Sequence, residues 1–313
     1  MFLRKKRDVH GFLLLDKPTG ISSSHALQKV KYIFHAKKAG YIGTLDPLAT
    51  GILPICFGEC TKFSFCLTQS RKRYYVIAKL GEKTSTLDRN GVILKKRPIL
   101  FTSSQLNSSI KELIGLIDQI PPMYSAIKYN GVPLYKYARQ GLTIHRKKRQ
   151  VFIYSIDFYK KNNLLACEIC CSKGTYIRTL IDDLGEKLGC GAHVISLRRL
   201  QISTYCVLQA IKLDNLCKFL NKNYNEQVNY FKGIDQFLMP IDSPVSCFPV
   251  VYLSKKMSNN FKLGQTVLVS SIMKNSLVRV VDENKSFLGI GKINSEKLLI
   301  PYRLVSILHN SVF

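Results

Sequence analysis

The residues best placed to do chemistry lie in a glycine-bounded segment, 43–51, which reads G-T-L-D-P-L-A-T-G. Its single acid is Asp46. Pro47 disfavours helix at the residue before it, so we expect Asp46 in an extended loop. Loops between packed strands often carry functional side chains, and a carboxylate there can act as a nucleophile. An aspartate before a proline is also well suited to cap a helix, so the sequence leaves both roles open.

Arg178 is the second candidate, because it stands near the start of a helical pattern that follows Gly174 and Thr175. The helix dipole disfavours a cation at that end, so we expect a carboxylate to hold it. Asp182, four residues further along the helix, is one possible partner, and Asp46 is the other. The residue pattern alone does not choose between them.

The stretch from Met123 to Gln150 is rich in tyrosine, lysine and arginine and contains no acidic residue. Cations suit phosphates and aromatic rings suit bases, so interleaving the two favours an RNA-binding surface. A solvated loop with a few buried tyrosines is the alternative.

The overall charge points the same way. The chain has 313 residues, with 47 Lys and Arg against 20 Asp and Glu, which gives a formal net charge of +27. An excess of this size predicts a polyanionic partner, either nucleic acid or an anionic membrane. The alternative explanation of the positive charge is an AT-rich coding sequence, which enriches lysine without any link to a partner. A hydrophobic content of 46% excludes general disorder, and the length suggests roughly two domains.

Other classes of site find little support. Cys167 and Cys170 form a CxxC within a strand-like run, where alternation directs them to opposite faces and away from a shared metal. Gly289 and Gly291 form a GxG that lacks a third glycine and a following helix. We therefore expect neither a metal nor a nucleotide cofactor.

The compartment follows from the apolar segments. No apolar run approaches 18 residues, and Asp16, Lys17 and Pro18 interrupt the one near the N-terminus. The sequence thus predicts neither a membrane span nor a signal peptide. We expect a cytoplasmic protein with reduced, buried cysteines.

Several elements must position these residues. Alternation predicts a strand at 74–80, with Tyr74 on its apolar face, and further strands at 151–159 and 164–171. Helical spacing predicts a helix from Thr102 or Ser103 through Ile117, and another around 177–188. Prolines 240, 244 and 249 indicate a linker, beyond which short strands at 266–269, 277–281, 287–293 and 298–300 predict a small β domain.

An ordered series of segments resembles the TruB family of pseudouridine synthases, which modify the T loop of tRNA. The resemblance covers residues 10 to 245, and the segment 250–307 is similar to that family's PUA domain. The matching segments are G-F-L-L-L-D-K-P at 11–18, the Asp46 loop, K-R-Y-Y-V at 72–76, Gly81 with Thr84, Thr86, Asp88 and Gly91, Q-I-P-P-M-Y-S-A-I-K at 119–128, L-Y-K-Y-A-R at 134–139, K-G-T-Y-I-R-T at 173–179, G-A-H-V at 191–194 and L-R-R-L at 197–200.

The resemblance implies an α+β fold with a mixed, mostly antiparallel sheet flanked by helices, followed by a small all-β PUA-like domain. It places a catalytic domain at 1–245, with an RNA-gripping thumb at about 122–150, and the PUA-like domain at 246–313. The implied activity is isomerisation of uridine to pseudouridine at position 55 of tRNA, without metal or cofactor. The implied partner is the T-arm stem-loop, with a monomeric enzyme and no obligate protein partner.

The resemblance also assigns roles to residues. Asp46 is the nucleophile, Arg178 its partner, and Tyr74 stacks on the uracil and offers a hydroxyl for proton removal. Tyr176 and Leu197 resemble further base-contacting positions, while Lys17 and Lys62 are expected to contact RNA backbone or to buttress the site; the alternative for both lysines is ordinary surface charge. Tyr41 stands where the family usually carries histidine. The tyrosine keeps an aromatic ring but cannot make the hydrogen bonds of an imidazole.

Two rival functions remain. A non-catalytic tRNA chaperone would explain the charge but not the combination of Asp46, Tyr74 and Arg178. The same chemistry directed by a guide RNA in a larger complex is the second. A methyltransferase is disfavoured, because the sequence lacks a cofactor-binding loop.

Overall fold

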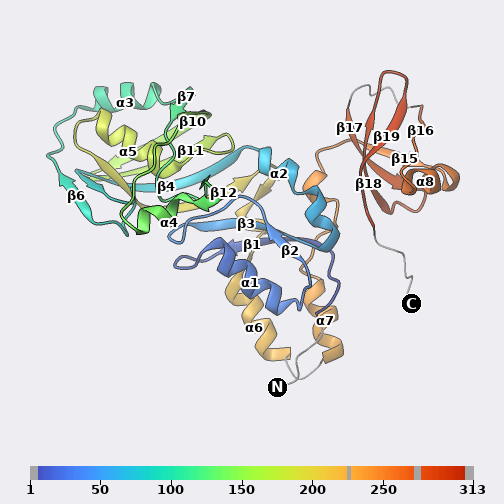
Figure 1. The fold of residues 1–313 in the computed structure, drawn as a ribbon. Helices are drawn as coiled ribbons and strands as arrows, with labels where there is room; N and C mark the ends of the chain where they lie inside the picture. Colours follow the sequence, from blue (N-terminus) through green and yellow to red (C-terminus); the bar gives the residue numbers. More distant parts are fainter. Residues whose placement is uncertain (1–5, 224–226, 271–275, 307–313) are drawn as a thin grey trace.

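The computed structural model describes residues 6–223, 227–270 and 276–306. Within them the chain forms a ten-stranded sheet, a five-stranded sheet and two two-stranded hairpins (Figure 1). The catalytic and PUA-like segments expected from the sequence extend beyond these residues at 1–5 and 307–313. None of the described helices is long and apolar enough to span a bilayer.

The large sheet has ten strands in the order β14-β1-β3-β12-β4-β11-β10-β7, with β2 beside β3 and β13 beside β12. Its β1–β14 and β3–β12 pairs are parallel and the others antiparallel, so the predicted mixed, mostly antiparallel sheet is confirmed. The strands are β1 (Gly11–Lys17), β2 (Ala39–Tyr41), β3 (Thr50–Phe57), β4 (Lys72–Leu80), β7 (Gly115–Gln119), β10 (Arg149–Lys161), β11 (Leu164–Cys171), β12 (Ala192–Ile202), β13 (Tyr205–Cys206) and β14 (Ile211–Lys212).

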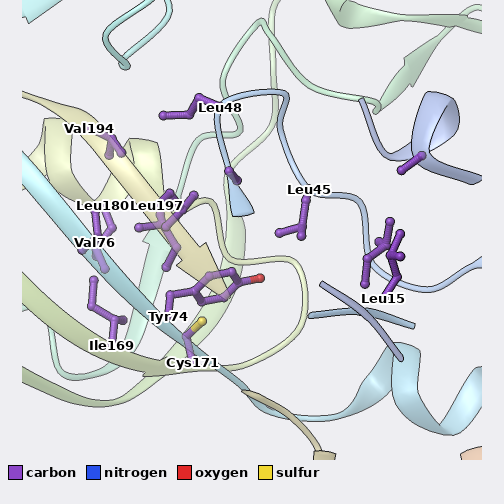
Figure 2. Packing of buried hydrophobic residues seen from close by; sticks show 14 of the residues in the cluster. Leu15, Leu45, Leu48, Tyr74, Val76, Ile169, Cys171, Leu180, Val194 and Leu197 are labelled. Carbon is purple, nitrogen blue, oxygen red and sulfur yellow. The ribbon is translucent and has the colours of Figure 1, made fainter. Parts of the chain in front are cut away.

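Strand β4 lies at the centre of this sheet, between β11 and β12, and carries Tyr74. Its residues alternate as predicted, with Lys72, Tyr74 and Val76 buried on one face and Arg73 and Tyr75 exposed on the other. The buried face belongs to the main core. In Figure 2 the Tyr74 ring lies at the edge of that core, with its hydroxyl directed toward the side where Leu45 lies.

The helices flank the sheet (Figure 1). They are α1 (Ser23–Ile33), α2 (Phe65–Gln69), α3 (Ser103–Lys111), α4 (Leu134–Arg139), α5 (Ile177–Lys187), α6 (Leu213–Asn223) and α7 (Gln227–Asp235), with short 3₁₀ turns η1 (Gly58–Phe63), η2 (Val207–Gln209) and η3 (Ser243–Val245). Helix α5 ends just before Gly189, which has a φ of +77°, as the sequence predicts. The sequence did not predict α6 and α7.

One helix prediction is too long. Thr102 caps α3 with a capping box, but the helix ends at Lys111, whereas the apolar spacing suggested that it continues to Ile117. Gly115 has a φ of +103°, which breaks the helix, and Ile117 instead lies in β7 opposite Val151 of β10. The tertiary partner therefore overrides a helical pattern.

Two short hairpins project from the large sheet's connections: β5 (Glu82–Thr84) with β6 (Ile93–Lys96), and β8 (Lys128–Tyr129) with β9 (Val132–Pro133). The second hairpin and α4 form the folded part of the basic, tyrosine-rich stretch 123–150. That stretch is therefore not simply an unstructured loop.

The C-terminal sheet has five strands, β15 (Val250–Leu253), β16 (Val267–Leu268), β17 (Leu277–Asp282), β18 (Phe287–Ile293) and β19 (Leu298–Leu304), in the order β15-β17-β18-β19-β16. The four strands predicted beyond the linker are thus confirmed. One helix, α8 (Lys255–Lys262), packs on the sheet through Phe261 and was not predicted. Phe63, Val245 and Ile290 form a separate apolar cluster that joins the small sheet to η1 and η3.

Candidate active site

A cavity of about 250 Å³ opens beside the end of β4, and several sequence-predicted residues line it. The structure brings together there Asp46, Tyr74, Tyr176, Arg178 and Leu197. Asp46 and Arg178 also line an adjoining cavity of about 510 Å³, which contains Tyr41. Side chains from distant parts of the sequence therefore converge on one place.

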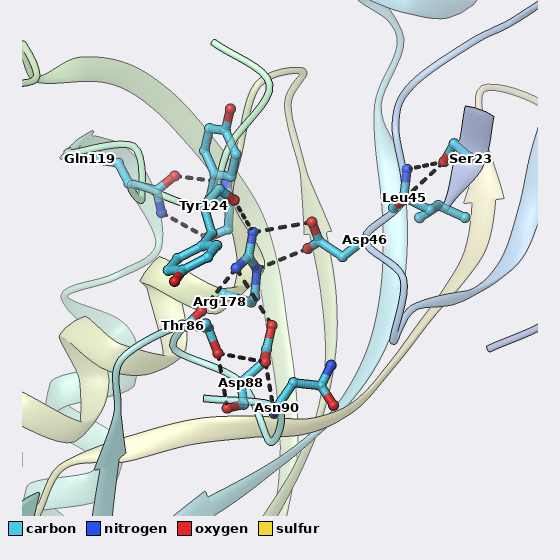
Figure 3. A network of polar contacts seen from close by, with 10 residues as sticks. Ser23, Leu45, Asp46, Thr86, Asp88, Asn90, Gln119, Tyr124 and Arg178 are labelled. Carbon is cyan, nitrogen blue, oxygen red and sulfur yellow. Dashed lines mark hydrogen bonds and ion pairs between the residues drawn. The ribbon is translucent and has the colours of Figure 1, made fainter. Parts of the chain in front are cut away.

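Asp46 and Arg178 form a two-pronged ion pair (Figure 3). Arg178 Nε lies 2.9 Å from Asp46 Oδ2, and Arg178 Nη2 donates to Asp46 Oδ1 at 3.1 Å. Asp182, the other possible partner, accepts instead from Lys83 Nζ at 3.1 Å. The choice that the sequence left open is thus decided in favour of Asp46. Forked pairing of this kind fixes the orientation of a carboxylate as well as its charge.

Further contacts hold Arg178 in place, and only 3% of this residue is exposed. It donates to the backbone oxygens of Thr86 at 2.9 Å and Tyr124 at 2.7 Å. Its Nη1 also lies 3.5 Å from the buried Asp88 Oδ2. A guanidinium with this many partners cannot rotate freely, so it presents a fixed fork to Asp46.

Asp88 is a member of this network that the sequence candidates did not include. Its Oδ1 accepts from Thr86 Oγ1 at 2.8 Å and from the Asn90 amide at 3.0 Å (Figure 3). A single aspartate in a polar turn forms no pattern with other residues that would mark it as functional in the sequence. The only hint was its position in the segment that resembled the family.

The Asp46 loop is anchored on both sides. The Leu45 amide donates to Ser23 Oγ at 2.8 Å, and that hydroxyl donates to the Leu45 oxygen at 2.9 Å. After Pro47 a turn closes with the Ala49 amide donating to the Asp46 oxygen at 3.0 Å, and β3 follows. The helix-cap alternative for Asp46 is therefore excluded, because no helix begins there.

The carboxylate at this position is electrostatically tuned. Burial raises the pKa of Asp46 above its ordinary value, the Arg178 guanidinium opposes that rise, and the Asp88 carboxylate adds to it. Burial likewise raises the pKa of Tyr74, and the Arg199 guanidinium opposes it. Opposed contributions of this kind are common at functional sites.

The base-contacting candidates form the walls of the cavity. Tyr74 is 7% exposed and Leu197 is 5% exposed, on neighbouring strands β4 and β12. The backbone of Tyr176 is clamped by the buried Gln119, which accepts from the Tyr176 amide at 2.8 Å and donates to its carbonyl at 3.1 Å. The site thus offers an aromatic and aliphatic enclosure around the ion pair.

Neither of the two lysines expected to contact RNA backbone or to buttress the site lines the cavity. Lys17 is fully buried, and its Nζ donates to the carbonyls of Pro18 and Ile21, both at 2.8 Å, with the Pro47 carbonyl at 3.5 Å. It therefore buttresses the Asp46 loop and does not line the cavity. Lys62 pairs with Glu59 at 2.7 Å and donates to the Leu304 carbonyl at the C-terminal sheet, so the structure does not bring it to the site.

The basic stretch 123–150 borders the site. Tyr135 and Arg139 of α4 line the 510 Å³ cavity together with Tyr41 and Asp46. The Arg139 guanidinium lies over the Tyr135 ring, 5.3 Å from its centre. A cation and aromatic rings from the stretch expected to bind RNA thus line a cavity that Asp46 also lines.

Comparisons with known proteins agree with this arrangement. Residues 31–177 match the model of the TruB family pseudouridylate synthase N-terminal domain. Residues 178–246 match the tRNA pseudouridylate synthase B C-terminal domain, and 249–305 match the pseudouridine synthase II TruB C-terminal model.

Two curated relatives span almost the whole chain. The chain is 65% identical over 308 residues to tRNA pseudouridine synthase B of Buchnera aphidicola subsp. Acyrthosiphon pisum, covering 98% of this chain and 99% of the relative. It is 51% identical over 304 residues to tRNA pseudouridine synthase B of Escherichia coli K12, covering 96% and 97%.

Among solved structures, a Cbf5-Nop10-Gar1 complex matches with a TM-score of 0.70 at 24% identity, covering 95% of this chain and 84% of that one. This likeness shows a shared fold. The family models and the two relatives show more, and the chain belongs to the TruB family of pseudouridine synthases.

Proposed function

We propose that the protein is a tRNA pseudouridine synthase that isomerises the T-loop uridine at position 55 of tRNA. The observation that carries the proposal is the Asp46 carboxylate, held by a buried arginine in a cavity walled by Tyr74, Tyr176 and Leu197. The relatives named tRNA pseudouridine synthase B support the tRNA substrate.

Asp46 acts as the nucleophile in the proposed reaction. The C1′–N1 bond of the uridine breaks, its electron pair leaves with the uracil, and an Asp46 oxygen bonds to C1′. The uracil then turns, C5 forms a bond to C1′, and the Asp46 oxygen is released. C5 finally loses its proton to a base and N1 gains one, so the atoms of substrate and product are the same.

The remaining residues support that chemistry. Arg178 keeps Asp46 ionised and aimed. In this proposal the Tyr74 ring stacks on the uracil, and its oxygen takes the C5 proton as the hydroxyl gives up its own proton, which balances the proton that N1 gains. Tyr176 and Leu197 complete the walls. The aromatic and aliphatic walls around the base limit the access of water, which would otherwise hydrolyse the cleaved nucleotide to an abasic site.

The flipped uridine must leave its stack at a cost of a few kcal/mol. RNA contacts from the thumb at 122–150 and the PUA-like domain at 246–313 offset that cost in this proposal, while 1–245 carries the chemistry. The T-arm stem-loop is the substrate element. The enzyme works as a cytoplasmic monomer, without a metal, cofactor or obligate protein partner.

The test is incubation of the purified protein with an unmodified T-arm stem-loop and position-resolved mapping of pseudouridine. Formation at the position equivalent to 55, without any added factor, supports the proposal. Binding and refolding of tRNA without pseudouridine would favour the chaperone. Activity that requires a guide RNA and accessory proteins would favour the guided rival.

A further inference from the structure

Two cations in the cavity have no role in the reaction described so far. Lys72 at the start of β4 is 7% exposed and Arg199 on β12 is fully buried, and both line the 250 Å³ cavity. Their ends converge near Gly43: a Cβ added to that glycine would stand 3.0 Å from Arg199 Nη1 and 3.7 Å from Lys72 Cε.

Neither cation is paired with a carboxylate among the described residues. Lys72 Nζ donates to the carbonyls of Thr68 at 3.2 Å and Ser70 at 2.7 Å. Arg199 donates from Nε to the Ile52 carbonyl at 2.7 Å and from Nη2 to the Gly43 carbonyl at 2.9 Å. These acceptors are dipoles that carry no compensating charge.

The balance of charge in the cavity is therefore positive. Asp46 is its single lining acid among the described residues, and Arg178 already matches it. Burying an unmatched charge is costly, and a fold that keeps two such charges in a cavity indicates a ligand that supplies the opposite sign.

The strand register places these charges beside the base. Arg199 is the direct cross-strand neighbour of Tyr74, and Lys72 lies two residues before Tyr74 on the same buried face of β4. Side chains at such positions project from the same face of a sheet. The ring proposed to stack on the uracil is thus flanked by the two unmatched cations.

We propose that Lys72 and Arg199 are further catalytic residues, which contact the uracil and stabilise the negative charge it carries after the C1′–N1 bond breaks. This inference rests on the proposed function. The electron pair of that bond becomes delocalised over N1, O2 and O4 of the departing uracil. The charge disappears when C5 bonds to C1′, so the cations stabilise the anionic stage more than the bound uridine.

The experiment compares bond cleavage in two T-arm stem-loops, one with uridine and one with 5-fluorouridine at the target position. Fluorine stabilises the uracil anion, so the departing base depends less on the cations. In single turnover, Lys72→Met should slow cleavage of uridine roughly 10²-fold, as loss of one preorganised charge donor typically does. The loss should be clearly smaller with 5-fluorouridine. Cleavage is measured as disappearance of the N-linked nucleoside.

Arg199→Met should show the same dependence on the base, and Arg199→Lys should restore part of the rate because it restores the charge. Arg199 also ties β3 to the Gly43 loop, so its variants are first checked for folding by thermal unfolding. If Arg199→Met does not fold, Lys72→Met alone decides. Lys79→Met is the matched control, because Lys79 lies in the same strand but pairs with Glu82.

A pH profile gives an independent readout. The pKa of Lys72 is lowered to about 8, chiefly by burial and also by the nearby Arg199 and Lys173 cations, while Cys171 opposes the shift. The lysine is charged below that value, so uridine turnover should fall as pH rises through about 8. Lys72→Arg should remain active to higher pH.

The outcomes separate the alternatives. Equal losses with both bases would overturn the proposal and leave the cations a structural role. A loss confined to RNA affinity would also overturn it, and would assign them to a phosphate. If the wild-type protein itself converts no uridine, the proposed function fails, independently of Lys72 and Arg199.

Discussion

Replacing Arg178 by methionine tests how the site controls its carboxylate. Methionine keeps much of the apolar bulk but removes the charge that lies 2.9 Å from Asp46 and 3.5 Å from Asp88. The two carboxylates are then left near each other without their shared cation. Removing one partner of a buried ion pair typically costs about 3–5 kcal/mol of stability.

The expected result has a thermal and a kinetic part. At roughly 2–4 °C per kcal/mol for a domain of this size, the Tm should fall by about 6–20 °C. Below that temperature the folded variant should lose roughly 10³-fold in turnover, because Asp46 is neither aimed nor kept ionised. Affinity for the T-arm should change far less, since Arg178 is buried.

The pH dependence of the single-turnover rate should shift in a definite direction when Arg178 is removed. Burial raises the pKa of Asp46 and Arg178 opposes that rise, so removing Arg178 raises the pKa further. Because the ionised carboxylate is the active form, the acidic limb of the single-turnover rate should move to higher pH. The deficit relative to wild type should therefore be largest at low pH. An unchanged Tm with an unmoved acidic limb, or a loss of RNA affinity alone, would refute this account of Arg178.

Three further predictions follow from the same structure. Asp88→Asn removes a carboxylate that raises the pKa of Asp46, so the acidic limb of the rate profile should move to lower pH, opposite to the Arg178 variant. A shift of that limb to higher pH would contradict the role given to Asp88. Gly51→Ala should lower the Tm, because Gly51 has a φ of +103° and a Cβ there would lie 2.2 Å from the Arg199 carbonyl oxygen. A Tm equal to that of the wild type would contradict this expected strain. If about six phosphates are neutralised, the logarithm of the tRNA association constant should fall with the logarithm of salt concentration at a slope of about −4 to −5, and a near-flat slope would assign most of the +27 charge to composition.

Much of the fold followed from local pattern. The alternation of β4 predicted which face Tyr74 occupies, and the spacing after Tyr176 predicted α5. The same kind of pattern failed at Ile117, because pairing of β7 with β10 outweighs a helical stripe once Gly115 breaks the helix. Local spacing carries no information about such a partner.

The site was only partly predictable for the same reason. Pro47 and the bounding glycines indicated a functional loop at Asp46, but its pairing with Arg178 spans 132 positions and depends on the folded sheet. Asp88 reaches the same arginine from a third segment. The buried position of Lys17 was also invisible, because an isolated lysine in a sequence reads as surface charge.

The measurement that tests the central claim most directly is pseudouridine mapping on unmodified tRNA treated with the wild-type protein and with Asp46→Asn. Asparagine is nearly isosteric and Asp88 remains beside Arg178, so the variant should fold, with a lower Tm than wild type, and bind the T-arm with wild-type affinity. We expect pseudouridine at position 55 with the wild type and none above background with Asp46→Asn. Conversion at that position by the variant would contradict the assignment of Asp46 as the nucleophile.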